Sequence, residues 1–347
     1  MPRLLSQLPA ARLLAAAAVC FSLAPLPALA NDSEAEWAVG GLALKANDAV
    51  SMDREELFIS AEEVRVDYTY TNHSDDPQTV LVSFPLPALP GQDQEWVEYG
   101  SWPDWSRLGF STTIDGKPAE WQTVVRAVAG GKDVTALVEA EGFPLEWYQD
   151  YDFVERIAAL PEAEAGRLAA KGLLVKEEGW GGNDYGPAWQ VQWHITRQQT
   201  FPAHATVSVS HRYTPIIGGS VGGLLHQLDD PQWADQKAHY RERFCTDDAF
   251  LAGVKKRQRA EQAKAGEDYS YYGETWIGYV LSSGANWRGP IKDFRLVVDK
   301  GRPDNLVSFC MDGVKKISPT QFEIRKTGYE PDRDLDILIV QWYEPEE

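Results

Sequence analysis

Apolar and polar residues alternate along several short stretches of this chain, and this period of two constrains the fold more than any other feature. In residues 64–71 the residues of one phase are all apolar: Val64, Val66, Tyr68 and Tyr70. The rhythm recurs in residues 189–196 and 206–213. Alternation places one face of a strand in a core and the other in water. These stretches therefore predict half-buried antiparallel strands.

Two stretches have a helical spacing instead. Near residues 132–173, apolar residues recur three and four apart, and a second helical stretch covers residues 246–265. The second half of that stretch carries a basic cluster: Lys255, Lys256, Arg257, Arg259 and Lys264. Such a cluster either docks an anionic partner or forms a solvated helix face.

These patterns predict a mainly β protein, an antiparallel β-sandwich with a helical insertion plus a smaller C-terminal β domain. The sandwich is expected in residues 31–225, with the helical insertion near 132–173. A helical linker, residues 226–268, leads into the C-terminal β domain, residues 269–347. Within that domain, residues 335–340 are apolar on both faces, which is typical of a central strand.

Residues 1–30 have the three parts of a signal peptide. Arg3 and Arg12 are positively charged, and residues 13–21 form an apolar core too short to span a bilayer. Ala28-Leu29-Ala30 has the small-x-small pattern of a cleavage site. We expect cleavage after Ala30, and a soluble periplasmic or secreted protein without membrane insertion.

The net charge of the chain indicates which partners it can bind, and its cysteines are interpreted from the compartment in which it folds. The chain has 33 Lys and Arg against 52 Asp and Glu, and a net charge of −19 repels nucleic acid. Cys20 leaves with the signal peptide, so Cys245 and Cys310 remain. In an oxidising compartment we expect these two to form a disulfide bond, the alternative being two buried free thiols.

Four segments of the chain share a family pattern. They are Phe84-Pro85-Leu86-Pro87, Phe201-Pro202-Ala203, residues 284–291, which begin Gly-Ala-Asn-Trp, and Ser308-Phe309-Cys310 with residues 313–318. These segments resemble the domain of unknown function 4424 family of exported bacterial proteins. The Gly-Ala-Asn-Trp segment is the most specific of them, and the resemblance covers nearly all of residues 31–347. It implies export but assigns no catalytic residues.

One motif suggests catalysis. Residues 218–222 fit Gly-x-Ser-x-Gly, the turn that raises a nucleophilic serine, here Ser220, above the sheet of an α/β-hydrolase. His239 and acidic residues follow it, but the alternation of strands and helices in that fold is absent. A glycine loop closing a β-hairpin is the alternative. The histidine and cysteine spacing fits no metal site, so we expect neither a metal nor a cofactor.

Two surfaces are candidates for ligand binding. The first is a loop with Trp96, Trp102 and Trp105, which either forms a sugar platform or folds back into the core. The second requires residues 190–196 and 206–212 to form a hairpin that turns at Phe201-Pro202. Its polar face would carry six side chains: Gln190, Gln192, His194, Ser208, Ser210 and Arg212. Such a face either orients a sugar or peptide or is an ordinary solvated surface.

The favoured interpretation is a non-enzymatic binding or assembly module of the bacterial cell envelope. Its ligand would be an envelope glycan, or another carbohydrate-like molecule, or a protein. The alternative is a periplasmic hydrolase that uses Ser220.

Overall fold

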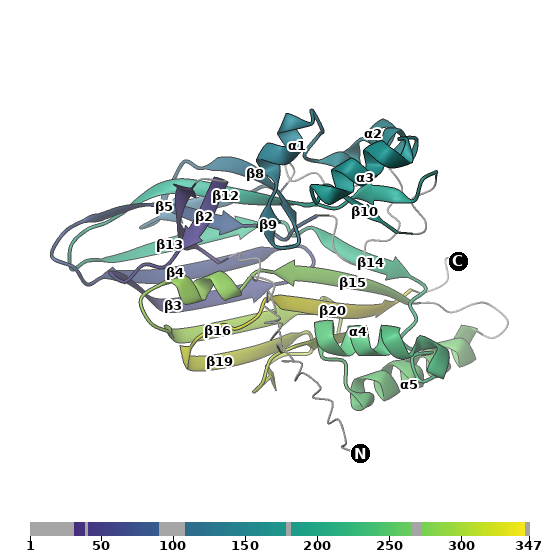
Figure 1. The fold of residues 1–347 in the computed structure, drawn as a ribbon. Helices are drawn as coiled ribbons and strands as arrows, with labels where there is room; N and C mark the ends of the chain where they lie inside the picture. The colour runs from purple at the N-terminus through teal and green to yellow at the C-terminus, as the bar shows by residue number, and fades with distance from the viewer. Residues whose placement is uncertain (1–30, 39–40, 90–107, 178–181, 266–271, 344–347) are drawn as a thin grey trace, which may run out of the picture.

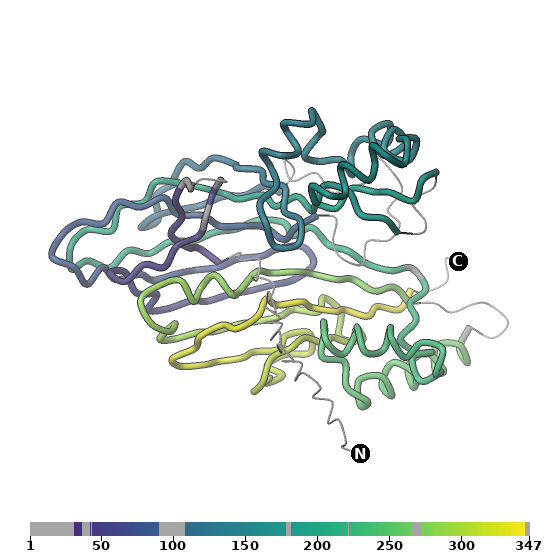
Figure 2. Tube along the Cα trace, in the orientation of Figure 1, coloured from purple at the N-terminus to yellow at the C-terminus, as the bar shows by residue number. Residues whose placement is uncertain are grey.

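The computed structural model describes residues 31–38, 41–89, 108–177, 182–265 and 272–343. The fold is mainly β, as predicted, and consists of sheets of eight, six, four and two strands. The two largest sheets lie face to face, and the helices α1 to α5 gather toward one side of the view in Figure 1. Figure 2 shows the same path as a continuous tube. The main hydrophobic core includes buried residues of the two large sheets and continues into the helical insertion and the four-stranded sheet.

The eight-stranded sheet has the order β18-β19-β16-β3-β4-β13-β6-β7. Its strands are β3 (Val50–Ile59), β4 (Val64–Asn72), β6 (Ser111–Ile114), β7 (Lys117–Pro118), β13 (Thr206–Tyr213), β16 (Ile291–Asp299), β18 (Lys315–Lys316) and β19 (Gln321–Tyr329). Strands β3 and β16 are parallel, and every other neighbouring pair is antiparallel. In β4 buried and half-buried residues alternate without a break, as the sequence pattern predicts.

The six-stranded sheet has the order β2-β1-β5-β12-β8-β9 and is antiparallel throughout. Its strands are β1 (Ser33–Ala38), β2 (Gly41–Lys45), β5 (Gln78–Pro85), β8 (Gln122–Ala129), β9 (Lys132–Asp133) and β12 (Gln190–Phe201). Phe201 packs against Tyr70 of β4, with ring centroids 5.6 Å apart. The two sheets therefore share one core.

A four-stranded sheet, β14-β15-β20-β17, extends beyond this sandwich. Its strands are β14 (Ile217–Val221), β15 (Tyr272–Tyr279), β17 (Leu306–Phe309) and β20 (Leu335–Trp342). Strand β20 pairs on both sides, which confirms the prediction of a central strand. Helices α4 (Ala234–Phe244) and α5 (Asp248–Ala265) enclose a second hydrophobic cluster with this sheet.

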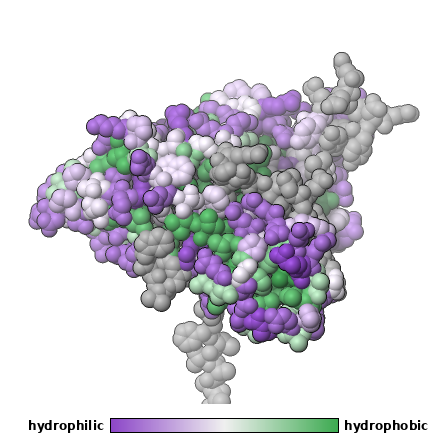
Figure 3. Space-filling model, turned by 90° about the horizontal axis from the view of Figure 1, so that it is seen from above, coloured by the Kyte–Doolittle hydropathy of each residue, from purple (hydrophilic) through white to green (hydrophobic). Residues whose placement is uncertain are grey.

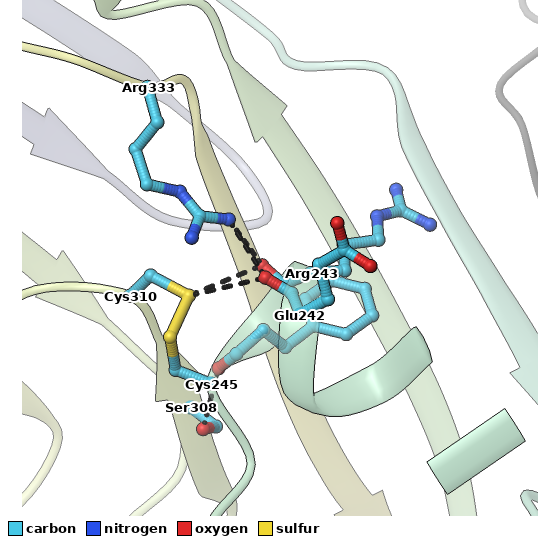
Figure 4. The surroundings of a disulfide bond; sticks show 7 residues. Glu242, Arg243, Cys245, Ser308, Cys310 and Arg333 are labelled. Carbon is cyan, nitrogen blue, oxygen red and sulfur yellow. Dashed lines mark hydrogen bonds between the residues drawn. A yellow bond between two sulfur atoms is a disulfide. The ribbon is translucent and has the colours of Figure 1, made fainter. Parts of the chain in front are cut away.

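The disulfide bond ties α4 to β17. Cys245 follows the last residue of α4 and is bonded to Cys310, with their α-carbons 5.0 Å apart. Figure 4 shows Arg333 beside the bond, donating to the carbonyl oxygen of Glu242 at 2.9 Å. The predicted pairing of the two cysteines is confirmed.

The basic cluster of α5 is largely paired within the chain. Lys255 contacts Asp229, Arg257 contacts Glu261 at 2.6 Å, and Lys264 contacts the same glutamate at 3.0 Å. These contacts favour the solvated helix face over an anion-docking surface.

The helical insertion contains three short α-helices and the 3-10 helix η2 (Trp147–Gln149). The α-helices are α1 (Thr135–Ala140), α2 (Tyr151–Ala158) and α3 (Glu162–Ala170), followed by the small sheet of β10 (Leu174–Lys176) and β11 (Tyr185–Pro187). Asp150 begins α2 by accepting a hydrogen bond from the amide of Phe153 at 2.9 Å. Figure 3 views the molecule from above, relative to Figure 1. On the face turned to the viewer, hydrophobic residues are interspersed with hydrophilic ones.

The predicted hairpin between residues 190–196 and 206–212 is wrong. Strand β12 pairs with β5 and β8, whereas β13 pairs with β4 and β6 in the opposite sheet. The chain after Phe201 thus crosses from one layer to the other. Both strands have an apolar face, and placing them in opposite layers packs those faces against each other across the core.

The C-terminal strands belong to two sheets. Strands β15, β17 and β20 form the four-stranded sheet with β14, whereas β16, β18 and β19 extend the eight-stranded sheet beside β3. The boundary expected near residue 268 therefore does not separate one sheet from another.

Candidate functional site

Half of the predicted polar surface lies on the outer side of the eight-stranded sheet. In β13, Ser208 and Arg212 are exposed and Ser210 is half-buried, while the residues between them are buried. Their partners across the strand pair are Thr69, Asp67 and Arg65 of β4. We call these six residues, with the neighbouring pair Thr71 and Thr206, the β4–β13 outer face.

The side chains of this face are ordered by contacts along the strand pair. Ser210 donates to Asp67 at 2.5 Å, and the hydroxyl oxygens of Thr71 and Thr206 are 3.1 Å apart. At one end, Arg65 lies opposite Arg212, and Glu63 is 3.6 Å from each guanidinium. The face therefore offers hydroxyl groups in its middle and two cations at one end.

The other half of the predicted surface lies on the six-stranded sheet, on β12. Gln192 and His194 are only 8% and 6% exposed. The Nδ1 atom of His194 is 3.0 Å from the hydroxyl of Ser83. Burial, together with the positive charge of Arg126, lowers the pKa of His194 to about 4, so its ring is neutral at pH 7. The six residues predicted to share one face thus lie on two sheets.

The remaining predicted residues divide into two groups. Trp96, Trp102 and Trp105 fall outside the described residues. Ser220 lies within β14, an antiparallel edge strand, and faces Glu274 of β15 in the pairing. A nucleophile elbow needs a sharp turn from a parallel strand into a helix. The arrangement around Ser220 has no such turn, so it does not support the hydrolase.

The strongest charge cluster is one that the sequence patterns did not indicate. Asp32 lies between the two large sheets, and Arg197 of β12 donates to its two oxygens at 2.6 and 3.2 Å. His211 of β13 approaches the same carboxylate from the other sheet, at 3.2 Å. The side chains of Asp32 and His211 are fully buried, and that of Arg197 is 2% exposed.

The charges of this cluster stabilise one another. Burial alone would raise the pKa of Asp32, but the charges and hydrogen bonds of Arg197 and His211 hold it well below its usual value. Burial lowers the pKa of His211 despite the neighbouring carboxylate. The pair that carries charge is therefore Asp32 with Arg197. An external substrate has no access to side chains this buried, so their role is to hold the sheets together.

A second buried carboxylate, Glu55 of β3, lies in the same core. Its Oε2 atom accepts a hydrogen bond from the side chain of Asn31 at 2.9 Å. Its Oε1 atom has no hydrogen-bond partner within the described residues. Burial, and then the negative charge of Asp32, raise the pKa of Glu55 to about 8. Glu55 thus has an unused acceptor and no cation beside it.

Within the described part of the chain, no group of three or more histidine, cysteine, aspartate or glutamate side chains is arranged to hold a metal ion. No helix among the same residues is long and apolar enough to cross a membrane.

Comparison with known proteins identifies the family. The model of the family described as "Domain of unknown function (DUF4424)" matches residues 30–338, and the chain belongs to this family. None of the curated proteins compared with the chain matches it.

Two solved structures have a distant likeness to this chain. The crystal structure of a candidate nutrient binding protein from Legionella pneumophila aligns at 12% identity and a TM-score of 0.43, over 90% of this chain and 70% of that one. An M1 zinc metallopeptidase from Deinococcus radiodurans aligns at 8% identity and a TM-score of 0.26, over 85% of this chain and 43% of that one. At TM-scores below 0.5, neither likeness bears on the function of this chain.

Proposed function

We propose that this member of the DUF4424 family is a non-enzymatic binding or assembly module of the bacterial cell envelope, exported and then processed after Ala30. Its ligand, an envelope glycan or a protein segment, lies across the β4–β13 outer face. The hydrolase alternative is set aside because Ser220 lies in an edge strand rather than in a nucleophile elbow.

The observation that carries the proposal is the chemistry of that face. Hydroxyl, carboxylate and guanidinium groups stand in two matched rows on adjacent strands, and Ser208 and Arg212 are exposed to solvent. Hydroxyl and carboxylate groups at the spacing of a strand pair can bond successive hydroxyls of a sugar or amides of an extended peptide. The arginine end would accept an acidic group on either ligand.

Retention of envelope glycans tests the proposal. We expect the purified protein to retain fluorescently labelled soluble peptidoglycan fragments. Replacing Ser208, Ser210 and Arg212 together with alanine should weaken retention at least about tenfold, since three ligand hydrogen bonds are lost. The melting temperature should change little because two of these side chains are exposed and the third is only half-buried.

A matched triple variant on the other large sheet is the control. Thr79, Gln198 and Thr200 are exposed polar residues of β5 and β12, and the two threonine hydroxyls are 2.8 Å apart. Their replacement with alanine should leave retention unchanged. If both triple variants retain the glycan equally well, the β4–β13 outer face is not the binding surface. Another outcome is that the purified protein retains a labelled protein and no glycan. If the triple variant of Ser208, Ser210 and Arg212 loses this retention and the control variant keeps it, the ligand is a protein.

A further inference from the structure

Residues 31–33 are held by the segment that contains the Gly-Ala-Asn-Trp residues, 284–287. Together with Ser282 and Ser283, the first three of these residues form the short helix η4 (Ser282–Asn286), and Trp287 follows it. Ser283 exchanges hydrogen bonds with both backbone groups of Asn31. Trp287 donates to the carbonyl oxygen of Asp32 at 2.6 Å, and Asn286 donates to Ser33 at 3.0 Å. We call Ser283, Asn286 and Trp287 the N-terminal clamp.

The glycine of this segment lets the clamp close. A β-carbon at position 284 would lie 2.6 Å from the side-chain nitrogen of Asn31, a distance that real contacts do not allow. Glycine at this position therefore leaves room for Asn31, which is fully buried. The Gly-Ala-Asn-Trp pattern is thus explained by its packing on residues 31–33.

The two buried carboxylates near the clamp differ in their partners. Asp32 and Glu55 are both fully buried, and Arg197 pairs with Asp32, whereas no cation from the described part of the chain lies beside Glu55. The Oε1 atom of Glu55 is an acceptor without a donor among the described residues. A buried carboxylate without a cation is costly, so such groups are ordinarily paired. Without a cation Glu55 is therefore protonated at neutral pH, and a positive charge next to Asn31 would stabilise its carboxylate form.

We propose that the N-terminal clamp and Glu55 form the binding site for the processed N-terminus, where the α-ammonium of Asn31 makes a buried ion pair with the Glu55 carboxylate. A protease of the signal peptidase class hydrolyses the Ala30–Asn31 peptide bond. Water supplies the carboxylate oxygen that Ala30 takes away. The nitrogen of Asn31 takes up protons and becomes the ammonium group.

The hydrogen-bond count agrees with this assignment. As a peptide amide, the nitrogen of Asn31 has one hydrogen, which it donates to Ser283. As an ammonium group it has three, leaving two more to donate. The side chain of the same residue already contacts Glu55, at 2.9 Å. The core would then contain two carboxylates, Asp32 and Glu55, and two cations, Arg197 and the α-ammonium group. Cleavage after Ala30 would supply the second cation.

Chemical labelling of the exported protein tests the inference directly. Its intact mass should show a chain that begins at Asn31. An amine-acylating reagent should modify the α-amino group at least about a hundredfold more slowly in the native protein than in urea. Lys132, which is exposed, should be modified at similar rates in both and serves as the internal control. A chain beginning at another residue, or an α-amino group that reacts equally fast in the native protein, would overturn the inference.

A variant cycle tests the partner. The processed protein is compared with a form that keeps Ala28, Leu29 and Ala30 ahead of Asn31, so that the nitrogen of Asn31 remains an amide. Glu55→Gln should reduce the folding equilibrium constant roughly a hundredfold more in the processed form, where it leaves a buried charge unpaired. If Glu55→Gln prevents folding of the processed form but not of the extended form, this result also supports the ion pair, because the processed form is then the more strongly destabilised of the two.

Glu274→Gln is the matched control. Glu274 is also buried and has one oxygen without a partner within the described residues, but it lies in the second hydrophobic cluster beside Tyr240 and Trp276. Its replacement should affect both forms equally. Equal effects of Glu55→Gln on the two forms would refute the ion pair. Because glycan retention does not enter this test, its result is independent of the proposed binding function.

Discussion

At the scale of single residues, burial determines the charge of His194 more than its neighbours do. The ring is 6% exposed and contacts Ser83, and its nearest charged neighbours, Arg126 and Asp133, act in opposite directions. In the unfolded chain the same ring is open to water. The protein therefore gains protons at His194 on unfolding over a defined range of pH.

This difference gives a pH-dependent stability. The pKa of His194 falls from 6.5 in the unfolded chain to about 4 in the folded protein. The unfolded chain thus takes up a proton first, and the free energy of unfolding should decrease as the pH drops from 6.5 to 4, by up to about 3 kcal/mol. In His194→Gln this loss should vanish. Urea unfolding of both proteins at several pH values measures the gap between them.

Gln192→Ala provides the comparison for His194→Gln. Gln192 is a buried neighbour on the same face of β12 and does not titrate. Its replacement should lower stability by the same amount at every pH. If the profiles of wild type and His194→Gln run parallel, His194 is not the group responsible.

Single charged residues were also the hardest features to predict. Glu55 is in phase with Leu57 and Ile59, and Arg197 is in phase with Ile195, so both occupy inward positions. A charged residue is stable there only beside a partner, and Asp32 is 165 residues away from Arg197 along the chain. Alternation identifies the inward phase but not the partner.

At the scale of elements, the disulfide bond secures α4 to the four-stranded sheet. Cys245 adopts a left-handed conformation, with φ 54°, directly after the helix, which turns the chain toward α5. Ser308 of β17 adds a hydrogen bond to the carbonyl oxygen of Phe244 at 2.9 Å. The bond therefore joins the two sides of the second hydrophobic cluster.

Replacing both cysteines with serine should lower the free energy of unfolding by about 4 kcal/mol, because the unfolded chain regains the freedom of a loop of 65 residues. Urea unfolding of the wild-type and variant proteins measures this. Wild type kept in a reductant is the control and should unfold like the variant. Equal stability of the oxidised and reduced wild type would contradict the expectation.

Elements were predicted well where local pattern decides them and poorly where distant partners do. The alternation in β4, the two-sided apolar pattern of β20 and the helices of the insertion all follow from nearby residues. The hairpin of β12 and β13 failed because pairing depends on β5 and β4, which precede them by more than a hundred residues. The short connection between β12 and β13 is also compatible with a hairpin, so its length did not show that the chain crosses from the six-stranded to the eight-stranded sheet there.

At the scale of the whole molecule, the parallel pairing of β3 with β16 unites the two ends of the chain in one sheet. Residues Arg54 to Ile59 pair with Asp293 to Val298. Without β16, the edge of β3 would be left unpaired, and such edges promote association with other chains.

We therefore expect the full-length protein to unfold in a single transition. Calorimetry should give matching calorimetric and van't Hoff enthalpies. A chain that ends at residue 268 lacks β16 and β19 and should show no cooperative transition. Two separate transitions in the full-length protein, or a cooperative transition in either part alone, would show that the parts fold independently.

The contact between Asn31 and Ser283 spans 252 residues. During synthesis, the first residues of this core therefore leave the ribosome long before the last, and the core cannot close until Trp287 has been made. Closing so long a loop is slow compared with forming local helices. Until then, the charged groups that the folded core buries, those of Asp32, Glu55 and Arg197, remain hydrated. The free-energy cost of removing them from water arises only when the core closes.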